Sequence, residues 1–227
     1  LAMKLGMNKI KHTLESYGFG HLTGIELPHE YEGIVPSRTW KRSALNLPWY
    51  SGDTVLAGIG QGYMLSSPLQ LANATAILAN RGTGFQPHLI KQIDHQGTTT
   101  QPLPPASSLS SSLWRYLHHA MQQVVMSKSP LGTGYRFGQD AAYSVAAKTG
   151  TVQVYRPKDG IFVPQPQLPK NLRDNALFIA FAPLKKPQIA VAVVIEHVSS
   201  SKAAQTARKV MDAYLLKPKS SGHNAKA

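Results

Sequence analysis

The sequence of 227 residues contains no cysteine. This absence excludes disulfide bonds, zinc sites built from thiolates and cysteine nucleophiles, but it does not identify a redox compartment. Long apolar runs are absent as well. The two longest, 176–182 and 189–195, have seven residues each, whereas a membrane-spanning helix needs roughly 20. Neither run therefore predicts a membrane span.

Acidic residues are scarce. The 11 Asp and Glu residues oppose 24 Lys and Arg residues, which gives a net charge of +13 with neutral histidines. Such a charge is compatible with a nucleic-acid ligand, with an anionic membrane surface or polymer, or with solubility alone. The basic residues are scattered and are densest only in 202–227, whereas a nucleic-acid interface requires them to cluster. We therefore expect no nucleic-acid partner.

The first residues lack both an initiator methionine and a helix cap. Leu1, Leu5 and Met7 already suggest a helix, with no capping residue before them. We therefore expect a piece from the C-terminal part of a longer protein, with any leader or anchor before residue 1. At the other end, 217–227 is polar and is predicted to be a disordered basic tail.

The strongest helix-start signal is Ser-Pro-Leu-Gln at 67–70. Ser67 suits the N-cap position, proline the first helical position and Gln70 the third, which together predict a capping box. Gly82 is placed to end this helix. Residues 20–49 are predicted to be rich in loops. Three further helices are predicted over 1–17 (ending at the glycines of 18–20), 113–126 (with Ser112 as a possible N-cap) and 202–216.

Three apolar segments near the C-terminus predict strands, at 143–155, 176–182 and 188–196. The last two are nearly continuous apolar runs, so we expect both to be buried on two faces. The short connector between them predicts an antiparallel pair. The fold class expected from these elements is α+β, with an antiparallel sheet flanked by helices. A hairpin is also predicted within 83–100, with 87–93 as one strand, and a long loop over 157–173.

The sequence Lys-Thr-Gly-Thr at 148–151 combines groups that can bind a carboxylate. Because side chains alternate along a strand, we expect Lys148 and Gly150 on one face and Thr149 on the other. At a sheet edge, the backbone groups of Gly150 and Thr151 would be free to bind an extended peptide, and glycine would allow its close approach. The lysine charge and threonine hydroxyls would hold a carboxylate. The Thr151 N–H would then face a developing oxyanion.

Lys-Thr-Gly is a signature of penicillin-recognising enzymes, together with Ser-x-x-Lys and Ser-x-Asn. The surrounding sequence resembles the transpeptidase domain of class B penicillin-binding proteins, in particular the elongation-type penicillin-binding protein 2. The matches follow family order, so 1–216 is expected to be the C-terminal part of this domain. They are Phe-Gly at 19–20, Thr-Gly-Ile-Glu-Leu at 23–27, Gly-Ile-Val-Pro at 33–36, Trp-Tyr at 49–50, Gly-Asp-Thr at 52–54, Gly-Ile-Gly-Gln-Gly-Tyr at 58–63, Ser-Pro-Leu-Gln-Leu-Ala at 67–72, Pro-His-Leu at 87–89, Gly-Thr-Gly at 132–134, Ala-Ala-Lys-Thr-Gly-Thr-Val-Gln-Val at 146–154 and Phe-Ile-Ala-Phe-Ala-Pro at 178–183.

The resemblance implies a serine enzyme that cross-links peptidoglycan. A serine attacks the D-Ala-D-Ala bond of a stem peptide, and an amine of a neighbouring strand then takes the acyl group. β-Lactams trap the same serine. Carried over by position, Lys148, Thr149 and Gly150 are the predicted catalytic residues. Thr149, Thr151 and Gln153 are the predicted substrate- and oxyanion-binding residues.

The resemblance also implies partners and a location. The expected ligands are peptidoglycan stem peptides and β-lactams. The expected protein partners are a RodA-type glycosyltransferase and the elongation machinery. A membrane anchor upstream of this chain would place the domain at the periplasmic face of the bacterial inner membrane. No cofactor is expected.

The sequence departs from the family pattern at the nucleophile. No Ser-x-x-Lys or Ser-x-Asn precedes Lys148, and the one literal match, Ser-Ser-Ser-Lys at 199–202, follows the last predicted strand. We interpret its serines as loop and N-cap residues of the terminal helix. The nucleophile is therefore expected outside this chain, which alone should be inactive. Two alternatives remain open: a β-lactam sensor or D,D-carboxypeptidase on the same fold, and a non-catalytic scaffold or partner-binding module.

Metal and phosphate sites have little support. The nine histidines show no paired spacing typical of metal ligands, and adjacent His118 and His119 would point in different directions on a helix. The glycine-rich segment 58–62 lacks the spacing and the following lysine of a phosphate-binding loop. We interpret it as a backbone turn behind the cleft, and we expect no metal site.

Overall fold

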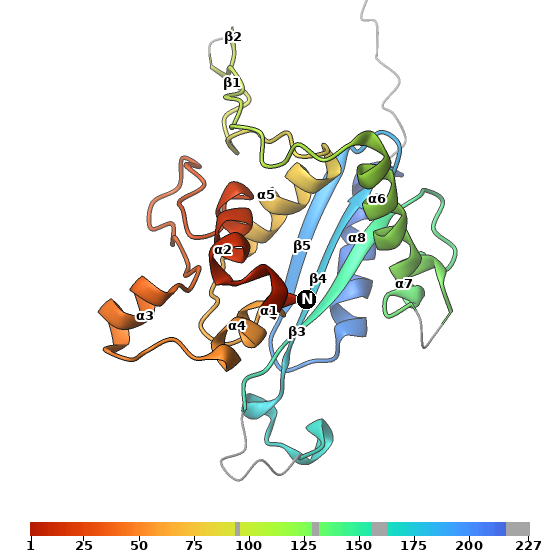
Figure 1. The fold of residues 1–227 in the computed structure, drawn as a ribbon. Helices are drawn as coiled ribbons and strands as arrows, with labels where there is room; N and C mark the ends of the chain where they lie inside the picture. The colour runs from red at the N-terminus through yellow and green to blue at the C-terminus, as the bar shows by residue number, and fades with distance from the viewer. Residues whose placement is uncertain (94–95, 129–131, 156–162, 217–227) are drawn as a thin grey trace, which may run out of the picture.

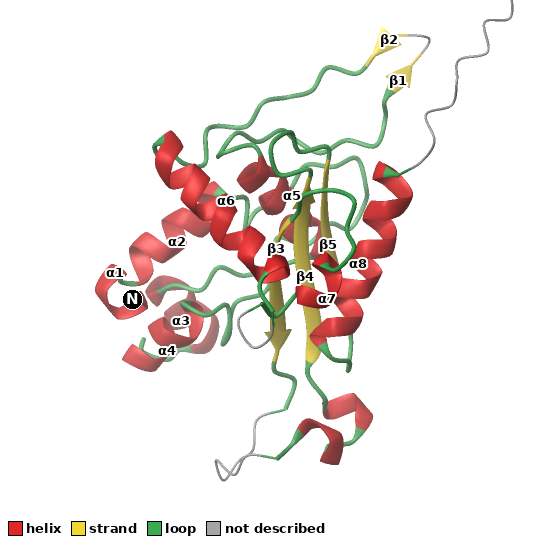
Figure 2. Cartoon of the chain, turned by 90° about the vertical axis from the view of Figure 1, so that its right-hand side faces the viewer, coloured by secondary structure: helices red, strands yellow, loops and turns green. Residues whose placement is uncertain are grey.

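The computed structural model describes residues 1–93, 96–128, 132–155 and 163–216. Its centre is an antiparallel sheet in the order β3-β4-β5, formed by Ala146–Val152, Asn175–Ala182 and Ile189–Ile195. Helix α8 (Ser200–Leu215) covers one face, whereas α5 (Pro68–Ala79) and α6 (Ser111–Met126) pack against the other side of the sheet (Figures 1 and 2). This arrangement confirms the predicted α+β fold and the antiparallel pairing of the last two strands.

The central strand β4 contributes to the core on both of its faces. Phe178 packs in the cluster that includes α8, whereas Phe181 packs against residues of α5 and α6. Burial on two faces is therefore confirmed for β4. It is wrong for β5, where Val194 remains 40% exposed. The reason is position, because β5 is one of the two outer strands of the described sheet and is paired only with β4.

Helix α5 begins as its sequence predicts. The Ser67 hydroxyl accepts a hydrogen bond from the Gln70 N–H at 3.1 Å, and the Gln70 side chain accepts one from the Ser67 N–H at 2.9 Å. The amide of Gln70 also donates to the carbonyls of His21 and Glu32. This one buried glutamine therefore both caps α5 and holds the N-terminal loop against it. Beyond the helix, Gly82 has a φ of +89° and its N–H bonds to the carbonyl of Ile77.

The N-terminal part differs most from the sequence prediction. The expected helix 1–17 is interrupted at Gly6, where φ is +77°, into α1 (Ala2–Leu5) and α2 (Met7–Ser16). Within the segment expected to be loops lies α3 (Arg38–Leu45), and α4 (Ser51–Ala57) follows it. These two helices are short, and their stability depends on packing and caps rather than on a long apolar stripe. These four helices form a group beside the sheet (Figure 1).

Helices α3 and α4 are joined by an ion pair. The ammonium group of Lys41 lies 2.6 Å from a carboxylate oxygen of Asp53, and the two side chains are only 3% and 12% exposed. The rings of Tyr50 and Tyr63 flank the ammonium, with centroids at 4.7 and 5.3 Å. The Tyr50 N–H also donates to the same carboxylate oxygen. Burial alone would raise the pKa of the Asp53 carboxyl, but these hydrogen bonds and the Lys41 charge hold it below its usual value.

The other elements follow the sequence with shifted ends. The hairpin near residue 95 has strands of two residues each, β1 (Gln92–Ile93) and β2 (Gln96–Gly97), and it projects from the body (Figure 1). The N-cap of α6 is Ser110 rather than Ser112. A short helix, α7 (Tyr135–Gly138), was not predicted. The predicted tail 217–227 and part of the predicted loop 157–173 lie outside the described residues. Among the described helices, none combines the length and apolarity required to cross a bilayer.

Candidate active site

Strand β3, which carries Lys-Thr-Gly, lies at the edge of the described sheet. Only β4 pairs with it, with Lys148 opposite Ile179, Thr149 opposite Phe178 and Gly150 opposite Leu177. The other edge of β3 therefore has no strand partner among the described residues. This confirms the expectation that the motif lies on an edge strand, where backbone groups are available to a ligand.

The backbone groups on the free side of β3 belong to alternate residues. The carbonyl of Thr151 accepts a hydrogen bond at 2.7 Å from the side chain of Gln61, which is not part of the sheet. In an antiparallel ladder the N–H and C=O of one residue point to the same side, and neighbouring residues point to opposite sides. The free groups are therefore those of Thr151 and Thr149, whereas Gly150 directs its groups to β4. The expectation that Gly150 offers its own backbone to a ligand is wrong.

Lys148 and Thr149 have local partners that set their positions. The exposed ammonium group of Lys148 donates to the carbonyl of Thr149 at 2.6 Å. The Thr149 hydroxyl lies 2.7 Å from the hydroxyl of Thr133, which belongs to the loop before α7. Both hydroxyls can donate and accept, so the pair fixes the orientation of Thr149 while leaving one lone pair or proton for a ligand.

The loop that carries Thr133 is held close to α6 by glycines. A Cβ atom added to Gly132 would lie 1.9 Å from the carbonyl oxygen of Ser127, and one added to Gly134 would lie 3.1 Å from a methyl group of Val125. Only glycine fits at the first position. Gly-Thr-Gly at 132–134 is among the family matches, but no contact between it and the site was predicted, although a threonine between two glycines was a usable signal for a loop that approaches other backbone closely.

Gly150 contributes no side chain to the face of β3 that carries Lys148. A Cβ atom there would lie 3.1 Å from the Cβ of Leu177 on β4, which is tight. The strand therefore has no side chain between Lys148 and Val152 on that face, which agrees with the predicted alternation of side chains.

The remaining predicted site residue, Gln153, lies just beyond the end of β3 and is exposed. The structure thus places Lys148, Thr149, Gly150 and Thr151 together on the edge strand, with Gln153 following them. Two further residues reach this strand from outside the sheet: Gln61, which lies 90 positions from Thr151, and Thr133, 16 positions from Thr149. The glycine-rich turn 58–62 is therefore more than a backbone turn, because its Gln61 side chain contacts the predicted site.

The Ser-x-x-Lys match at 199–202 is placed as predicted, at the start of α8 with Ser199 as the N-cap residue. Residues of this match line a cavity of about 530 Å³. Thr151 and the basic side chains of Arg173 and His197 line the same cavity. The hydroxyl of Ser199 lies 2.9 Å from that of Ser201. In the described part of the chain, the Ser199 hydroxyl makes no hydrogen bond with the Lys202 ammonium, the base that a Ser-x-x-Lys nucleophile requires. The interpretation of these serines as helix-start residues therefore stands.

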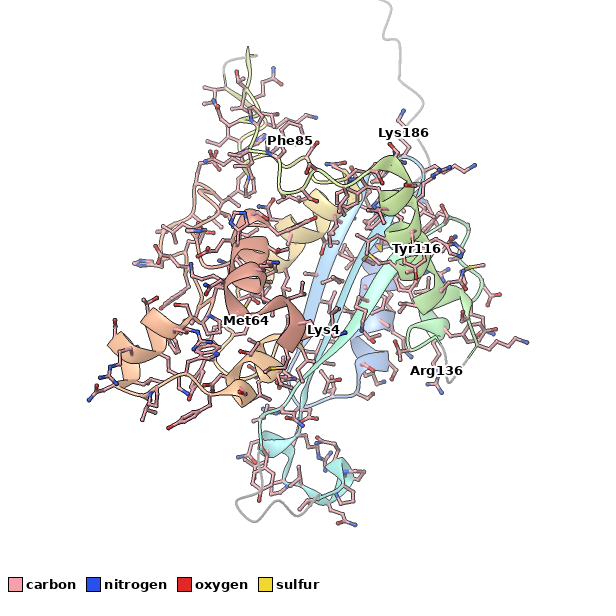
Figure 3. All side chains as sticks on the ribbon, in the orientation of Figure 1. Lys4, Met64, Phe85, Tyr116, Arg136 and Lys186 are labelled. Carbon is pink, nitrogen blue, oxygen red and sulfur yellow. The ribbon has the colours of Figure 1, made fainter. Side chains whose placement is uncertain are left out.

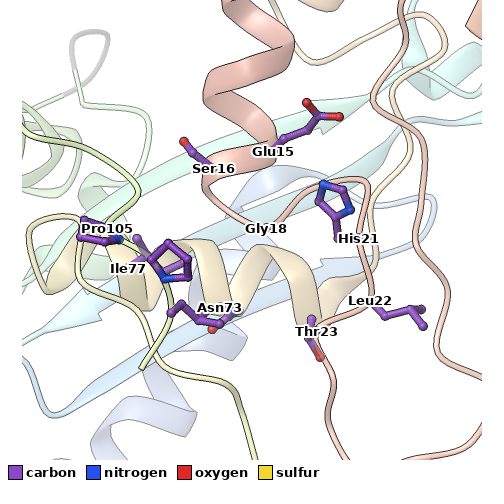
Figure 4. Close-up of a pocket in the computed structure, with 11 residues that line it drawn as sticks. Glu15, Ser16, Gly18, His21, Leu22, Thr23, Asn73, Ile77 and Pro105 are labelled. Atoms are coloured by element: carbon purple, nitrogen blue, oxygen red, sulfur yellow. The ribbon is translucent and has the colours of Figure 1, made fainter. Parts of the chain in front are cut away.

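Another cavity lies away from the predicted site. It has a volume of about 240 Å³ and lies between the end of α2, helix α5 and the prolines at 104–105 (Figure 4). Its lining includes Glu15, His21 and Asn73 but none of the predicted site residues.

In the view of Figure 3, Met64 lies on one side of β3, and Tyr116 and Arg136 lie on the other. Within the described part of the chain, no group of three His, Asp or Glu side chains could hold a metal ion.

Comparisons with known proteins agree with this geometry. The family described as "Penicillin binding protein transpeptidase domain" matches residues 1–212. The peptidoglycan D,D-transpeptidase MrdA of Haemophilus influenzae is 39% identical over 223 residues, covering 95% of this chain and 34% of that protein. MrdA of Salmonella typhimurium is 37% identical over 220 residues, covering 93% of this chain and 35% of that protein. The chain therefore spans about a third of the length of these relatives.

Solved structures give the same assignment. Pseudomonas aeruginosa PBP2, in complex with WCK 5153, superposes with a TM-score of 0.80 at 39% identity, covering 96% of this chain and 46% of that one. Helicobacter pylori PBP2, in a complex with MreC, superposes with a TM-score of 0.76 at 29% identity, covering 95% of this chain and 37% of that one. The order of motifs, the edge strand and the match over nearly the whole chain agree: the protein belongs to the penicillin-binding protein transpeptidase domain family, with relatives named MrdA and PBP2.

Proposed function

We propose that this chain forms one wall of the active site of a peptidoglycan D,D-transpeptidase whose nucleophilic serine lies outside residues 1–227. Residues 1–216 would be the C-terminal part of the transpeptidase domain. The observation that carries the proposal is the free edge of β3, where Lys148, Thr149 and Thr151 follow one another beside an edge without a strand partner in the described structure. The names of the relatives, which are peptidoglycan D,D-transpeptidases, support the same reaction.

The geometry suggests how the donor peptide would bind. An extended stem peptide would pair with the outward backbone groups of Thr149 and Thr151, as an added strand does. The Lys148 ammonium and the threonine hydroxyls would hold the carboxylate of the terminal D-alanine. The Thr151 N–H, which points to the free side with its carbonyl, would donate to the oxygen of the scissile carbonyl as negative charge develops there.

The reaction has two steps. The serine oxygen attacks the carbonyl carbon between the two D-alanines, the C–N bond breaks, and the terminal D-alanine leaves with the proton that the serine gave up. An amine of a second peptide then attacks the acyl ester, the ester C–O bond breaks, and the proton returns to the serine oxygen. A β-lactam presents a carbonyl and a carboxylate in the same relation and would acylate the same serine.

The partners and location are proposed from the relatives. One similar structure is a complex between PBP2 and MreC, and another is described as a peptidoglycan synthase complex that coordinates polymerisation and crosslinking. By similarity, the full-length protein would work with the elongation machinery, including a RodA-type glycosyltransferase, at the periplasmic face of the inner membrane.

The test uses the full-length protein that contains this chain. Time-resolved labelling with a fluorescent penicillin should show acylation of the wild type, and Lys148→Ala should lower the acylation rate at least about tenfold, because the carboxylate loses a charge-assisted hydrogen bond. Lys91→Ala, at an exposed lysine near the hairpin, is the matched control and should label like the wild type. Lack of labelling in the wild type, or full labelling of Lys148→Ala, would count against the proposal. With a stem peptide and an amine acceptor, the cross-linked product distinguishes a transpeptidase from a carboxypeptidase, which gives only hydrolysis.

A further inference from the structure

The free edge of β3 is partly occupied, because side chains of this chain donate hydrogen bonds to two of its outward carbonyls, those of Thr149 and Thr151. The ammonium of Lys148 donates to the Thr149 carbonyl at 2.6 Å, and the amide of Gln61 donates to the Thr151 carbonyl at 2.7 Å. Edge strands with free pairing groups invite unwanted pairing, and internal donors of this kind suppress it. The same donors occupy the carbonyls to which a ligand would donate if it bound by strand addition.

Gln61 is held in position for this contact by its own backbone. Its N–H bonds to the carbonyl of Leu56 at the end of α4, at 2.9 Å. The flanking glycines, Gly60 and Gly62, have φ values of +72° and +77°, which L-residues with a side chain rarely adopt. The turn is therefore fixed at α4, and only the flexible side chain of Gln61 spans the distance to β3.

The bond that Gln61 makes is chemically the same as the bond that a peptide ligand would make. A side-chain amide N–H and a peptide N–H are equivalent donors to a backbone carbonyl. The outward carbonyl of Thr151 is the acceptor for both, and the contact is exposed to solvent. An extended acyl donor that pairs with this part of β3 therefore competes with Gln61 for this carbonyl.

We propose that Gln61 is a positioning residue that occupies the acyl donor's hydrogen-bonding place on the Thr151 carbonyl and releases it when the donor binds. This inference rests on the proposed function and adds to it a selection among donors. A donor with an N–H at this place replaces the bond that Gln61 gives up. A compound without that N–H makes no hydrogen bond to the Thr151 carbonyl and does not displace Gln61. The glutamine therefore does not affect the rate at which that compound acylates the protein.

The experiment compares two β-lactams on the full-length protein. Benzylpenicillin carries a side-chain amide N–H, whereas sulbactam carries no side chain on its β-lactam ring. Gln61→Met removes the competing donor but keeps the length of the side chain, and Gln61→Ala removes it by truncation. Both variants should raise the acylation rate constant for benzylpenicillin about two- to tenfold, the factor that corresponds to one net hydrogen bond. The rate constant for sulbactam should not change.

A matched control comes from a second glutamine with the same kind of contact. Gln86 donates its amide to the carbonyl of Gly24 at 2.6 Å, in an exposed position among loop residues. Gln86→Met should leave both rate constants unchanged. Thermal unfolding of each variant establishes that the compared proteins are folded.

Each outcome decides a different point. If the acylation rate constants of the Gln61 variants fall equally for both compounds, Gln61 only supports β3. If the ratio of the benzylpenicillin to the sulbactam rate constant is the same as in the wild type, Gln61 does not compete with ligands. Either result overturns the inference while the proposed function stands. If the wild type is acylated by neither compound, the proposed function itself fails and the inference falls with it.

Discussion

The hydroxyl groups of Thr133 and Thr149 lie 2.7 Å apart, which joins the loop before α7 to the middle residue of Lys-Thr-Gly. Thr133 is exposed and packs in no core cluster, so its contact with Thr149 is its clearest structural role. Because a hydroxyl can be held in one orientation by such a partner, the loop and the edge strand form a single unit at the candidate site.

The first prediction concerns this pair. Thr133→Val keeps the shape of the side chain but removes its hydroxyl, so the Thr149 hydroxyl is free to rotate and binds a carboxylate less well. We expect the acylation rate constant for a fluorescent penicillin to fall about three- to tenfold, as for the loss of one hydrogen bond. Thr133→Ser retains the hydroxyl and should restore most of the rate. A Thr133→Val protein that acylates at the wild-type rate would show that this hydroxyl does not matter to the site.

The second prediction concerns close packing between α7 and α6. A Cβ atom at Gly138 would lie 2.1 Å from the carbonyl oxygen of Val125, so backbone must shift to accommodate it. Gly138→Ala should therefore lower the free energy of unfolding by about 1–3 kcal/mol, the usual cost of overpacking. Thermal unfolding of the full-length protein measures the change.

The control for this prediction is another helical glycine. A Cβ atom at Gly52, in α4, would meet no atom within 4 Å. Gly52→Ala should leave the melting temperature unchanged or raise it, because alanine favours the helix by up to about 1 kcal/mol over glycine. If both alanine variants behave alike, the close approach of α7 to α6 is not as described.

The third prediction concerns the ion pair between α3 and α4. Hydrogen bonds from Lys41 and Tyr50 outweigh the effect of burial and lower the pKa of the Asp53 carboxyl below its ordinary value of 3.8. A carboxyl whose pKa is lowered by folding stabilises the fold above its unfolded pKa, and this contribution is lost as the pH falls through its folded pKa. Asp53→Asn removes the contribution and leaves Lys41 without its charged partner.

We therefore expect Asp53→Asn to unfold at a lower urea concentration than the wild type at about pH 7, with the difference shrinking as the pH falls below 3.8, the ordinary pKa of the carboxyl. Urea unfolding at a series of pH values measures this. Asp140→Asn is the control, because Asp140 is exposed and its left-handed backbone conformation, with φ of 61°, is one that asparagine tolerates. A pH-independent difference for Asp53→Asn would show that the charge of Asp53 does not contribute.

Local signals predicted some elements well and others poorly. Ser67 and Gln70 predicted the start of α5 because a capping box is made by residues three positions apart, which sequence alone brings together. The same reasoning did not find α3 and α4, where prolines and short length hid the helical pattern. The burial of β5 was overestimated, because apolar composition does not show which strand is outermost.

The sequence likewise predicted some residues of the candidate site and missed others. Lys148, Thr149 and Thr151 were identified from their order and chemistry, since neighbours on one strand keep a fixed relation wherever the strand is placed. Gln61 and Thr133 were missed as contacts. Their glycine neighbours signalled tight turns, but nothing in the sequence named the strand toward which those turns would direct a side chain.

The amino-acid sequence by itself determined the capping box of α5, the antiparallel pairing across a short connector and the motif that carries the proposed chemistry. Each of these depends on residues that are close along the chain or on a fixed repeat. Only the tertiary structure decided that the backbone groups of Thr149 and Thr151, rather than those of Gly150, point to the free edge, and that Gln61 occupies one of them. A hydrogen bond between residues 90 positions apart depends on how the helices and sheet pack together, and that packing is a property of the whole fold.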